Sequence, residues 1–238
     1  MVHPKATSSI SLKQAMSSRI ITPLWASILV SVPPSLMWLL SPSIRRRAST
    51  SDISTRVIGL LGMIQALYVL TLFISFNIEG VALTYTIKAL EPVGNMWILR
   101  VIGRPTHVTR ISLMGLCILP FGIFLTQISS SVNLSGLVYA LVNVILTCVR
   151  SVLVKHYTHD PSVSYFQISA YGLLALMPGA LLAIHDFSPQ IWMADTNLQF
   201  GVASFIGYNC ASFFVLSMVE PILHGALNVF KRCITVTL

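Results

Sequence analysis

Four cationic side chains interrupt long apolar stretches of this 238-residue chain: Lys88, Arg150, Lys231 and Arg232. An ionisable side chain at membrane depth costs about 3 kcal/mol or more unless it faces a partner or a water-filled cavity. Lysine offers phosphoryl oxygens a point charge, and arginine offers them a planar fork of donors. Cations that meet in one cavity would repel each other when it is empty. We therefore expect them to attract an anion with more than one negative charge, such as phosphate.

The C-terminal stretch "HGALNVFKRCITVTL", residues 224–238, carries a polar stripe on an apolar background. His224, Asn228 and Lys231 are four and three residues apart, a spacing that places them on one helix face, and Arg232 follows Asn228 by four residues. This pattern predicts a helix with one side along an aqueous pathway.

Each charge also has a simpler interpretation. Lys88 and Glu91, three residues apart on one helix face, could neutralise each other. Arg150 lies near a helix end and could extend its head group to the lipid head groups. Lys231 and Arg232 could flank the membrane if 221–230 is not a span.

The composition is typical of an integral membrane protein. Hydrophobic residues make up 55% of the chain and charged residues 9%, against about 25% charged residues in soluble domains. The cysteines, Cys117, Cys148, Cys210 and Cys233, form no metal or redox pair, the histidines form no metal-binding cluster, and no nucleotide-binding motif is present. We expect a lipid bilayer as partner, no nucleic acid, no metal and no cofactor.

The apolar runs predict an all-α, polytopic transmembrane bundle, because about 20 apolar residues cross a bilayer as a helix. A basic tail, 1–19, precedes a membrane domain over 20–238. Eight helices are expected, at 20–44 (with a kink at Pro33-Pro34), 57–78, 79–99, 111–128, 137–149, 161–185, 196–219 and 221–238.

The loops between these helices predict an orientation. Loops 43–56, 100–110 and 155–162 carry arginine or lysine and fall on one side, whereas 129–136 and 186–198 carry neither. The positive-inside rule places the first three in the cytosol. The basic tail 1–19 opposes this arrangement, and a further helix ahead of it would remove the conflict.

Three segments together resemble the triose-phosphate translocator family, within the drug/metabolite transporter superfamily. They are "VALTYTIKALEPV" at 81–93, "NVILTCVRSVLVK" at 143–155 and "YNCASFFVLSMVEPILHGALNVFKR" at 208–232. The resemblance implies ten helices in two inverted halves with a site near the midplane. It also implies exchange of a phosphorylated three-, five- or six-carbon compound for inorganic phosphate, or of a nucleotide sugar for a nucleotide monophosphate.

The resemblance also assigns roles to residues. Lys88, Lys231 and Arg232 match the phosphate-binding cations, Tyr208 matches a tyrosine that hydrogen-bonds the phosphate, and Arg150 matches an arginine at the far end of the substrate. We place Thr84, His224 and Asn228 along the same cavity.

Three positions depart from the family pattern. Val69 and Leu72 stand where plastid members carry a histidine and a small hydroxyl residue, and Tyr85 replaces a frequent histidine. One wall of the site is therefore expected to be more apolar.

The sequence favours a sugar-phosphate/phosphate antiporter that works by alternating access and makes or breaks no bond. A nucleotide-sugar transporter is the alternative, so the location is the plastid envelope or a Golgi or endoplasmic reticulum membrane. By comparison with the family, the chain is expected to lack the first helix, the second half of the ninth and the tenth, which leaves a non-transporting membrane protein as a third interpretation. A membrane-embedded enzyme is disfavoured, because Glu91, the mid-span carboxylate, has Lys88 as an obvious partner.

Overall fold

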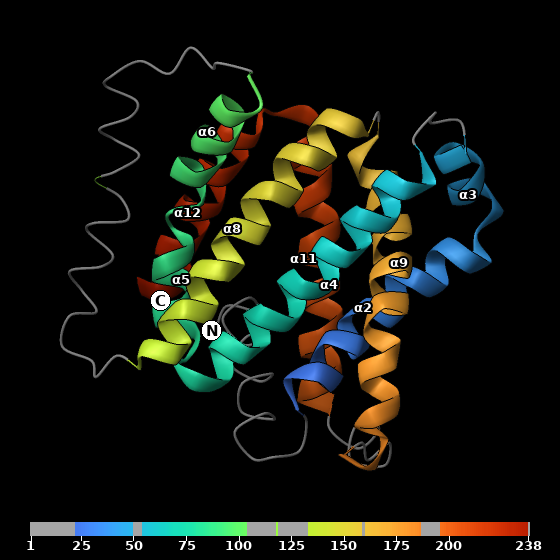
Figure 1. The fold of residues 1–238 in the computed structure, drawn as a ribbon, viewed down its shortest axis with the longest axis horizontal. Helices are drawn as coiled ribbons and strands as arrows, with labels where there is room; N and C mark the ends of the chain where they lie inside the picture. The colour runs from blue at the N-terminus through green and yellow to red at the C-terminus, as the bar shows by residue number, and fades with distance from the viewer. Residues whose placement is uncertain are drawn as a thin grey trace.

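The computed structural model describes residues 22–49, 54–103, 118, 133–158, 160–186 and 196–237. These residues form helices and short turns, with no strand among them (Figure 1). The helices are α2 (Pro23–Leu40), α3 (Pro42–Ser49), α4 (Thr55–Ile78), α5 (Val81–Lys88), α6 (Glu91–Val101), α8 (Leu134–Tyr157), α9 (Pro161–Leu182), the 3-10 turn η1 (Ile184–Asp186), α11 (Thr196–Met218) and α12 (Pro221–Thr237). The tail 1–19 and the expected span 111–128 lie outside the described residues.

The all-α transmembrane bundle is confirmed. Five of the described helices are long and apolar enough to cross a membrane: Pro23–Leu40, Thr55–Ile78, Leu134–Tyr157, Val163–Leu182 and Leu198–Met218. Each overlaps a span expected from hydropathy, but α8 extends beyond the expected 137–149 at both ends and includes the first residues of the expected loop 155–162. The chain is therefore a multi-pass membrane protein.

The expectation of one continuous span over 79–99 is wrong, because the helix breaks at Ala89 and Leu90. The last turn of α5 tightens, with the Ala89 amide donating to the Thr86 carbonyl and the Leu90 amide to the Ile87 carbonyl, each at 3.1 Å. Pro92 then stands in the first turn of α6. Proline has no N–H to donate to the carbonyl of residue 88, and its ring disfavours helical backbone before it, so the chain restarts as a new helix.

The segment 43–56, expected as a loop, is partly helical. Ser41 adopts an extended conformation at the end of α2, as residues before a proline prefer. Pro42 then opens α3, because its fixed φ suits the first position of a helix. Arg45, Arg46 and Arg47 therefore follow α2 on a short helix, whereas Arg56 lies in the first turn of α4.

Helix α2 continues through Pro33 and Pro34. The hydroxyls of Ser31 and Ser35 donate to the carbonyls four residues earlier, at 2.7 and 2.6 Å. Pro33 and Pro34 lack the N–H groups that would bond the carbonyls of residues 29 and 30, and the two serine hydroxyls bond other carbonyls of the same helix.

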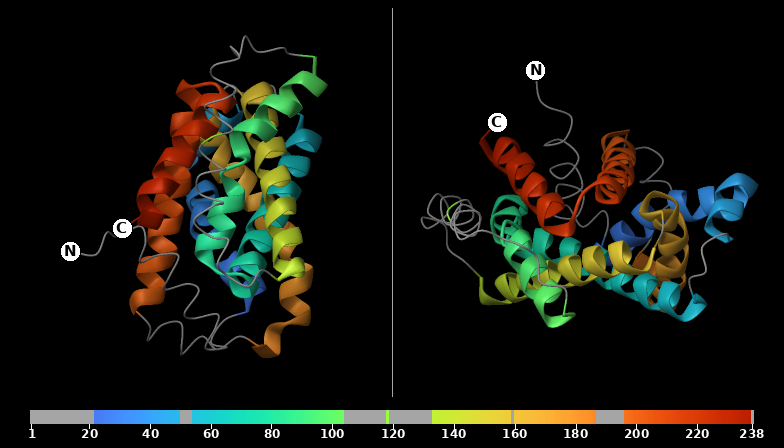
Figure 2. Two further views of the ribbon diagram at one scale, coloured as in Figure 1. Left: turned by 90° about the vertical axis from the view of Figure 1, so that its left-hand side faces the viewer. Right: turned by 90° about the horizontal axis from the view of Figure 1, so that it is seen from above.

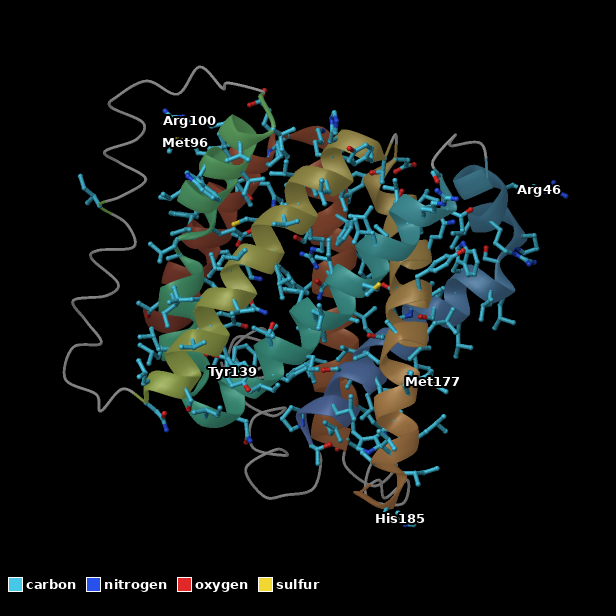
Figure 3. The ribbon with its side chains drawn as sticks, viewed as in Figure 1. Arg46, Met96, Arg100, Tyr139, Met177 and His185 are labelled. Carbon is cyan, nitrogen blue, oxygen red and sulfur yellow. The ribbon has the colours of Figure 1, made fainter. Side chains whose placement is uncertain are left out.

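Helices α4 and α9 lie at the centre of the packing among the long helices. Helix α4 packs against α8 and α9, and α9 also packs against α2. Helix α12 lies beside α6 in all three views (Figures 1 and 2). Arg46 and Arg100 lie toward one end of the bundle and His185 at the other (Figure 3), as the loop assignment expects.

Candidate substrate-binding site

Lys88 is buried at the C-terminal end of α5, where 3% of its surface is exposed. Its Nζ donates to Asn143 Oδ1 at 2.5 Å and to Thr147 Oγ1 at 3.4 Å, both on α8. The helix break contributes to this burial, since carbonyls at a helix C-terminus carry partial negative charge and favour a cation in the last turn. A continuous helix would have placed Lys88 in mid-helix without that stabilisation.

Arg150 is the second buried cation, with 5% of its surface exposed. Its Nη1 donates to Gln65 Oε1 on α4 at 2.6 Å. The guanidinium carbon lies 4.2 Å from the ring centroid of Tyr68 and 5.2 Å from that of Phe213 on α11. These contacts hold the head group inside the bundle, so the interpretation in which Arg150 extends to the lipid head groups is wrong.

Tyr68 joins the two cations. Lys88 Nζ lies 4.8 Å from the centroid of its ring, which Arg150 also approaches. The backbone carbonyl of Tyr68 accepts a 2.6 Å hydrogen bond from Asn143, the residue that binds Lys88. The full set, hereafter the α4–α8 cluster, is Gln65, Tyr68, Lys88, Asn143, Thr147 and Arg150.

A second set of polar side chains lies where α12 meets α6 and α11. The Tyr208 hydroxyl donates to Asn228 Oδ1 at 3.2 Å. Asn228 Nδ2 donates to Glu91 Oε1 at 3.2 Å and lies 3.5 Å from His224 Nδ1. Lys231 Nζ lies 3.0 Å from the ring centroid of Tyr208. Ser212 Oγ lies 2.9 Å from His224 Nε2. These residues are called the α12 cluster: Glu91, Tyr208, Ser212, His224, Asn228 and Lys231.

The α12 cluster depends on a close crossing of α6 and α12. Asn95 Nδ2 on α6 donates to the Pro221 carbonyl at the start of α12, at 2.8 Å. One turn further along α12, a Cβ at Gly225 would lie 3.2 Å from Pro92 Cα and 3.0 Å from Asn95 Nδ2. The missing side chain lets the two helices approach, and this brings Asn228 within reach of Glu91.

The other sequence-predicted positions have different surroundings. Thr84 is fully buried; its hydroxyl donates to the Gly80 carbonyl and shares a hydrogen bond with Ser75 on α4, each at 2.8 Å. Arg232 lies on α12, but its side chain is outside the described part of the chain.

The positions that depart from the family pattern are packed in apolar surroundings. Val69 and Leu72 belong to a buried cluster with Phe73 and Phe76. The ring of Tyr85 packs edge-on against Phe76 with centroids 5.5 Å apart. The side of α4 that carries Val69 and Leu72 is therefore apolar.

Sequence reasoning missed the contribution of α4. Gln65, Tyr68 and Thr71 follow one another at three-residue intervals in an apolar helix and contact Arg150 or Asn143. That spacing places them on one helix face, so the same search for polar stripes that found the α12 residues could have found them.

The two clusters together supply ammonium and guanidinium groups, amides, hydroxyls, an imidazole and one carboxylate. These groups can bind and orient an oxyanion by charge-assisted hydrogen bonds. Among the residues that the structure describes, no group of three or more His, Cys, Asp or Glu side chains could hold a metal ion.

The chain is similar to the chloroplastic triose phosphate/phosphate translocator of Brassica oleracea var. botrytis, with 25% identity over 207 residues. This match covers 81% of the chain and 50% of the relative, so the chain spans about half the length of the curated relative that it matches. The model of the Triose-phosphate Transporter family matches residues 9–238, which include both clusters. The chain therefore belongs to the Triose-phosphate Transporter family.

Proposed function

We propose that the protein exchanges a phosphorylated sugar or three-carbon phosphate for inorganic phosphate across a membrane. The observation that carries this proposal is the pair of buried cations, Lys88 and Arg150, which both lie close to the ring of Tyr68. They lie inside the helical bundle of a chain that belongs to a transporter family. A buried cation pair of this kind favours a small polyanion over a neutral solute.

The geometry of the pair supports exchange rather than one-way transport. Lys88 Nζ and Arg150 Cζ are at most about 9 Å apart, since they lie 4.8 and 4.2 Å from the same centroid. Two like charges at that distance repel by about 2 kcal/mol at an effective dielectric constant of 20. A bound anion removes this repulsion, so the loaded carrier changes conformation more readily than the empty one, as alternating access with obligatory exchange requires.

In this proposal the α12 helix supplies the phosphate-binding groups other than Lys88, together with Tyr208 on α11. Lys231 Nζ lies over the ring of Tyr208, and the hydroxyl of that tyrosine donates to Asn228. Arg232 follows Lys231 on the same helix. In this proposal Lys88, Lys231, Arg232 and Tyr208 bind the phosphate, and Arg150 faces the other end of the substrate, with Thr84, His224 and Asn228 along the cavity.

A second candidate function is exchange of a nucleotide sugar for a nucleotide monophosphate. The aliphatic side chains of Val69 and Leu72, packed among phenylalanines, favour it because they offer no hydrogen bonds to a short sugar phosphate on that side. The first function suits a plastid envelope and the second a Golgi or endoplasmic reticulum membrane.

Counterflow into liposomes that contain the purified chain tests both functions, with labelled phosphate in one assay and a labelled nucleotide monophosphate in the other. Internal triose phosphate or hexose phosphate should drive uptake of labelled phosphate. Uptake of the labelled nucleotide monophosphate driven by internal nucleotide sugar, without uptake of labelled phosphate, would favour the second function. Arg46→Ala, on the exposed surface of α3, is the matched control that keeps every buried cation, and it should exchange like the wild type. Absence of any exchange would refute both functions and leave a non-transporting membrane protein.

A further inference from the structure

Helix α8 carries three polar side chains at four-residue intervals: Thr147, Ser151 and Lys155. Residues four apart lie on the same face of a helix, one turn after the other. These three side chains therefore form a polar stripe along α8, next to the buried Arg150. The contacts at the two ends of the stripe indicate what its middle residue faces.

Hydrogen bonds to two different helices fix the ends of the stripe. Thr147 Oγ1 accepts from Lys88 Nζ at the C-terminal end of α5, at 3.4 Å. Lys155 Nζ donates to two carbonyls in the last turn of α11, at 3.1 and 2.8 Å, and that end of α11 leads into α12. Ser151 therefore lies between the residue that binds Lys88 and the residue that binds the junction of α11 and α12.

The Ser151 hydroxyl differs from the side chains at both ends of the stripe. Only 1% of the surface of Ser151 is exposed, and its Oγ has no hydrogen-bond partner among the residues that the structure describes. The hydroxyls of Thr147 and Thr158, on the same side of α8 or at its end, donate to the carbonyls four residues earlier, at 2.7 and 2.6 Å. Ser151 does not make this bond. Because buried hydroxyls are as a rule hydrogen-bonded, this one points to a group that the chain itself does not supply.

We propose that Ser151 is a further substrate-binding residue, whose hydroxyl donates a hydrogen bond to an oxygen of the bound phosphate group. The proposal rests on the proposed function, in which Lys88 on α5 and Lys231 on α12 bind that group. A serine hydroxyl can donate its proton to a phosphoryl oxygen, and it adds a neutral donor between these cations without a further charge to desolvate. Inorganic phosphate and a phosphorylated carbon compound share the phosphate group, so both gain from this bond.

Thermal stabilisation of the purified protein by inorganic phosphate and by a triose phosphate measures the bond without transport. Ser151→Ala removes the hydroxyl, and Ser151→Cys replaces it with a thiol, which is a weak donor. Both variants should bind each ligand about tenfold more weakly than the wild type or worse, since the lost hydrogen bond is to a charged group. The melting temperature of ligand-free Ser151→Ala should equal or exceed that of the wild type, because the hydroxyl makes no bond within the described part of the chain.

Ser35→Ala is the matched control. Ser35 on α2 is also 1% exposed, but its hydroxyl donates to the Ser31 carbonyl at 2.6 Å. Its replacement removes a buried serine hydroxyl that belongs to neither cluster. Affinity for both ligands should therefore stay at the wild-type value, whatever the change in melting temperature.

The outcomes separate this proposal from the proposed function. Wild-type affinity for both ligands in Ser151→Ala and Ser151→Cys overturns the role of Ser151. A loss confined to triose phosphate also overturns it, because the hydroxyl would then contact the carbon portion rather than the phosphate group. A wild type that binds both ligands but does not exchange them in the liposome counterflow assay overturns the proposed function alone. A wild type that neither ligand stabilises overturns both.

Discussion

Replacement of Lys88 by methionine tests whether its buried charge serves binding or folding. Methionine keeps a long, unbranched side chain and removes the ammonium. The variant loses the bonds to Asn143 and Thr147, and leaving a buried amide oxygen unsatisfied costs about 1 to 3 kcal/mol. The variant also avoids burying an ammonium, whose desolvation costs several kcal/mol. These opposing effects should keep the change in unfolding free energy within about 2 kcal/mol.

The effect on exchange should be much larger. A unit charge about 4 Å from a phosphate oxygen contributes about 4 kcal/mol at an effective dielectric constant of 20, and each 1.36 kcal/mol corresponds to a tenfold change. Loss of the Lys88 ammonium should therefore reduce the rate of phosphate exchange by about a thousandfold.

Two assays on the same preparation separate the two effects. Phosphate counterflow in liposomes measures exchange, and thermal unfolding in detergent measures stability, with Lys88→Arg as the variant that keeps the charge. Exchange within tenfold of wild type by the methionine variant would refute this reasoning, because it would restrict Lys88 to holding Asn143 and α8 in place.

Three further predictions concern other contacts. Tyr208→Phe removes the hydroxyl that donates to Asn228 and should weaken apparent substrate affinity by about 1 to 3 kcal/mol if that hydroxyl binds a phosphate oxygen; unchanged half-saturation would assign the ring to packing alone. Lys155→Met removes the ammonium that donates to the Leu216 and Ser217 carbonyls at the end of α11, and should lower the unfolding free energy by about 1 to 3 kcal/mol, whereas Lys155→Arg should retain most of it in the same thermal assay. Gly225→Ala places a Cβ against the backbone of α6 and should lower both the melting temperature and the exchange rate, with a cost of about 1 to 3 kcal/mol; a melting temperature equal to wild type would show that α6 and α12 separate freely.

Hydropathy and helical spacing predicted much of the bundle. The spans at 57–78 and 196–219 correspond closely to α4 and α11, because a bilayer imposes a minimum apolar length on every crossing. The stripe of His224 and Asn228 likewise forms one contact group on α12, since residues four apart share a face in any helix.

Other features depended on information that a periodic pattern does not carry. The break before Glu91 was present in the sequence as Glu-Pro, but 79–99 is apolar apart from Glu79, Lys88 and Glu91 and hydropathy therefore predicts one span. The pairing of Arg150 with Tyr68 and Gln65 required knowing that α4 and α8 lie side by side. Hydropathy gives each helix its length but does not specify its neighbours, so polar contacts between helices could not be assigned.

The break between α5 and α6 has a consequence for how this protein enters its membrane. Neither helix, at 8 and 11 residues, reaches the roughly 20 residues that a bilayer crossing needs. The pair spans the bundle only end to end (Figure 1), with Lys88 and Glu91 at the joint. A lone segment of this kind partitions poorly from the translocon into lipid, because a central lysine alone opposes insertion by about 3 kcal/mol. Stable integration of 81–101 must therefore wait for α8, synthesised later, whose Asn143 and Thr147 receive the lysine.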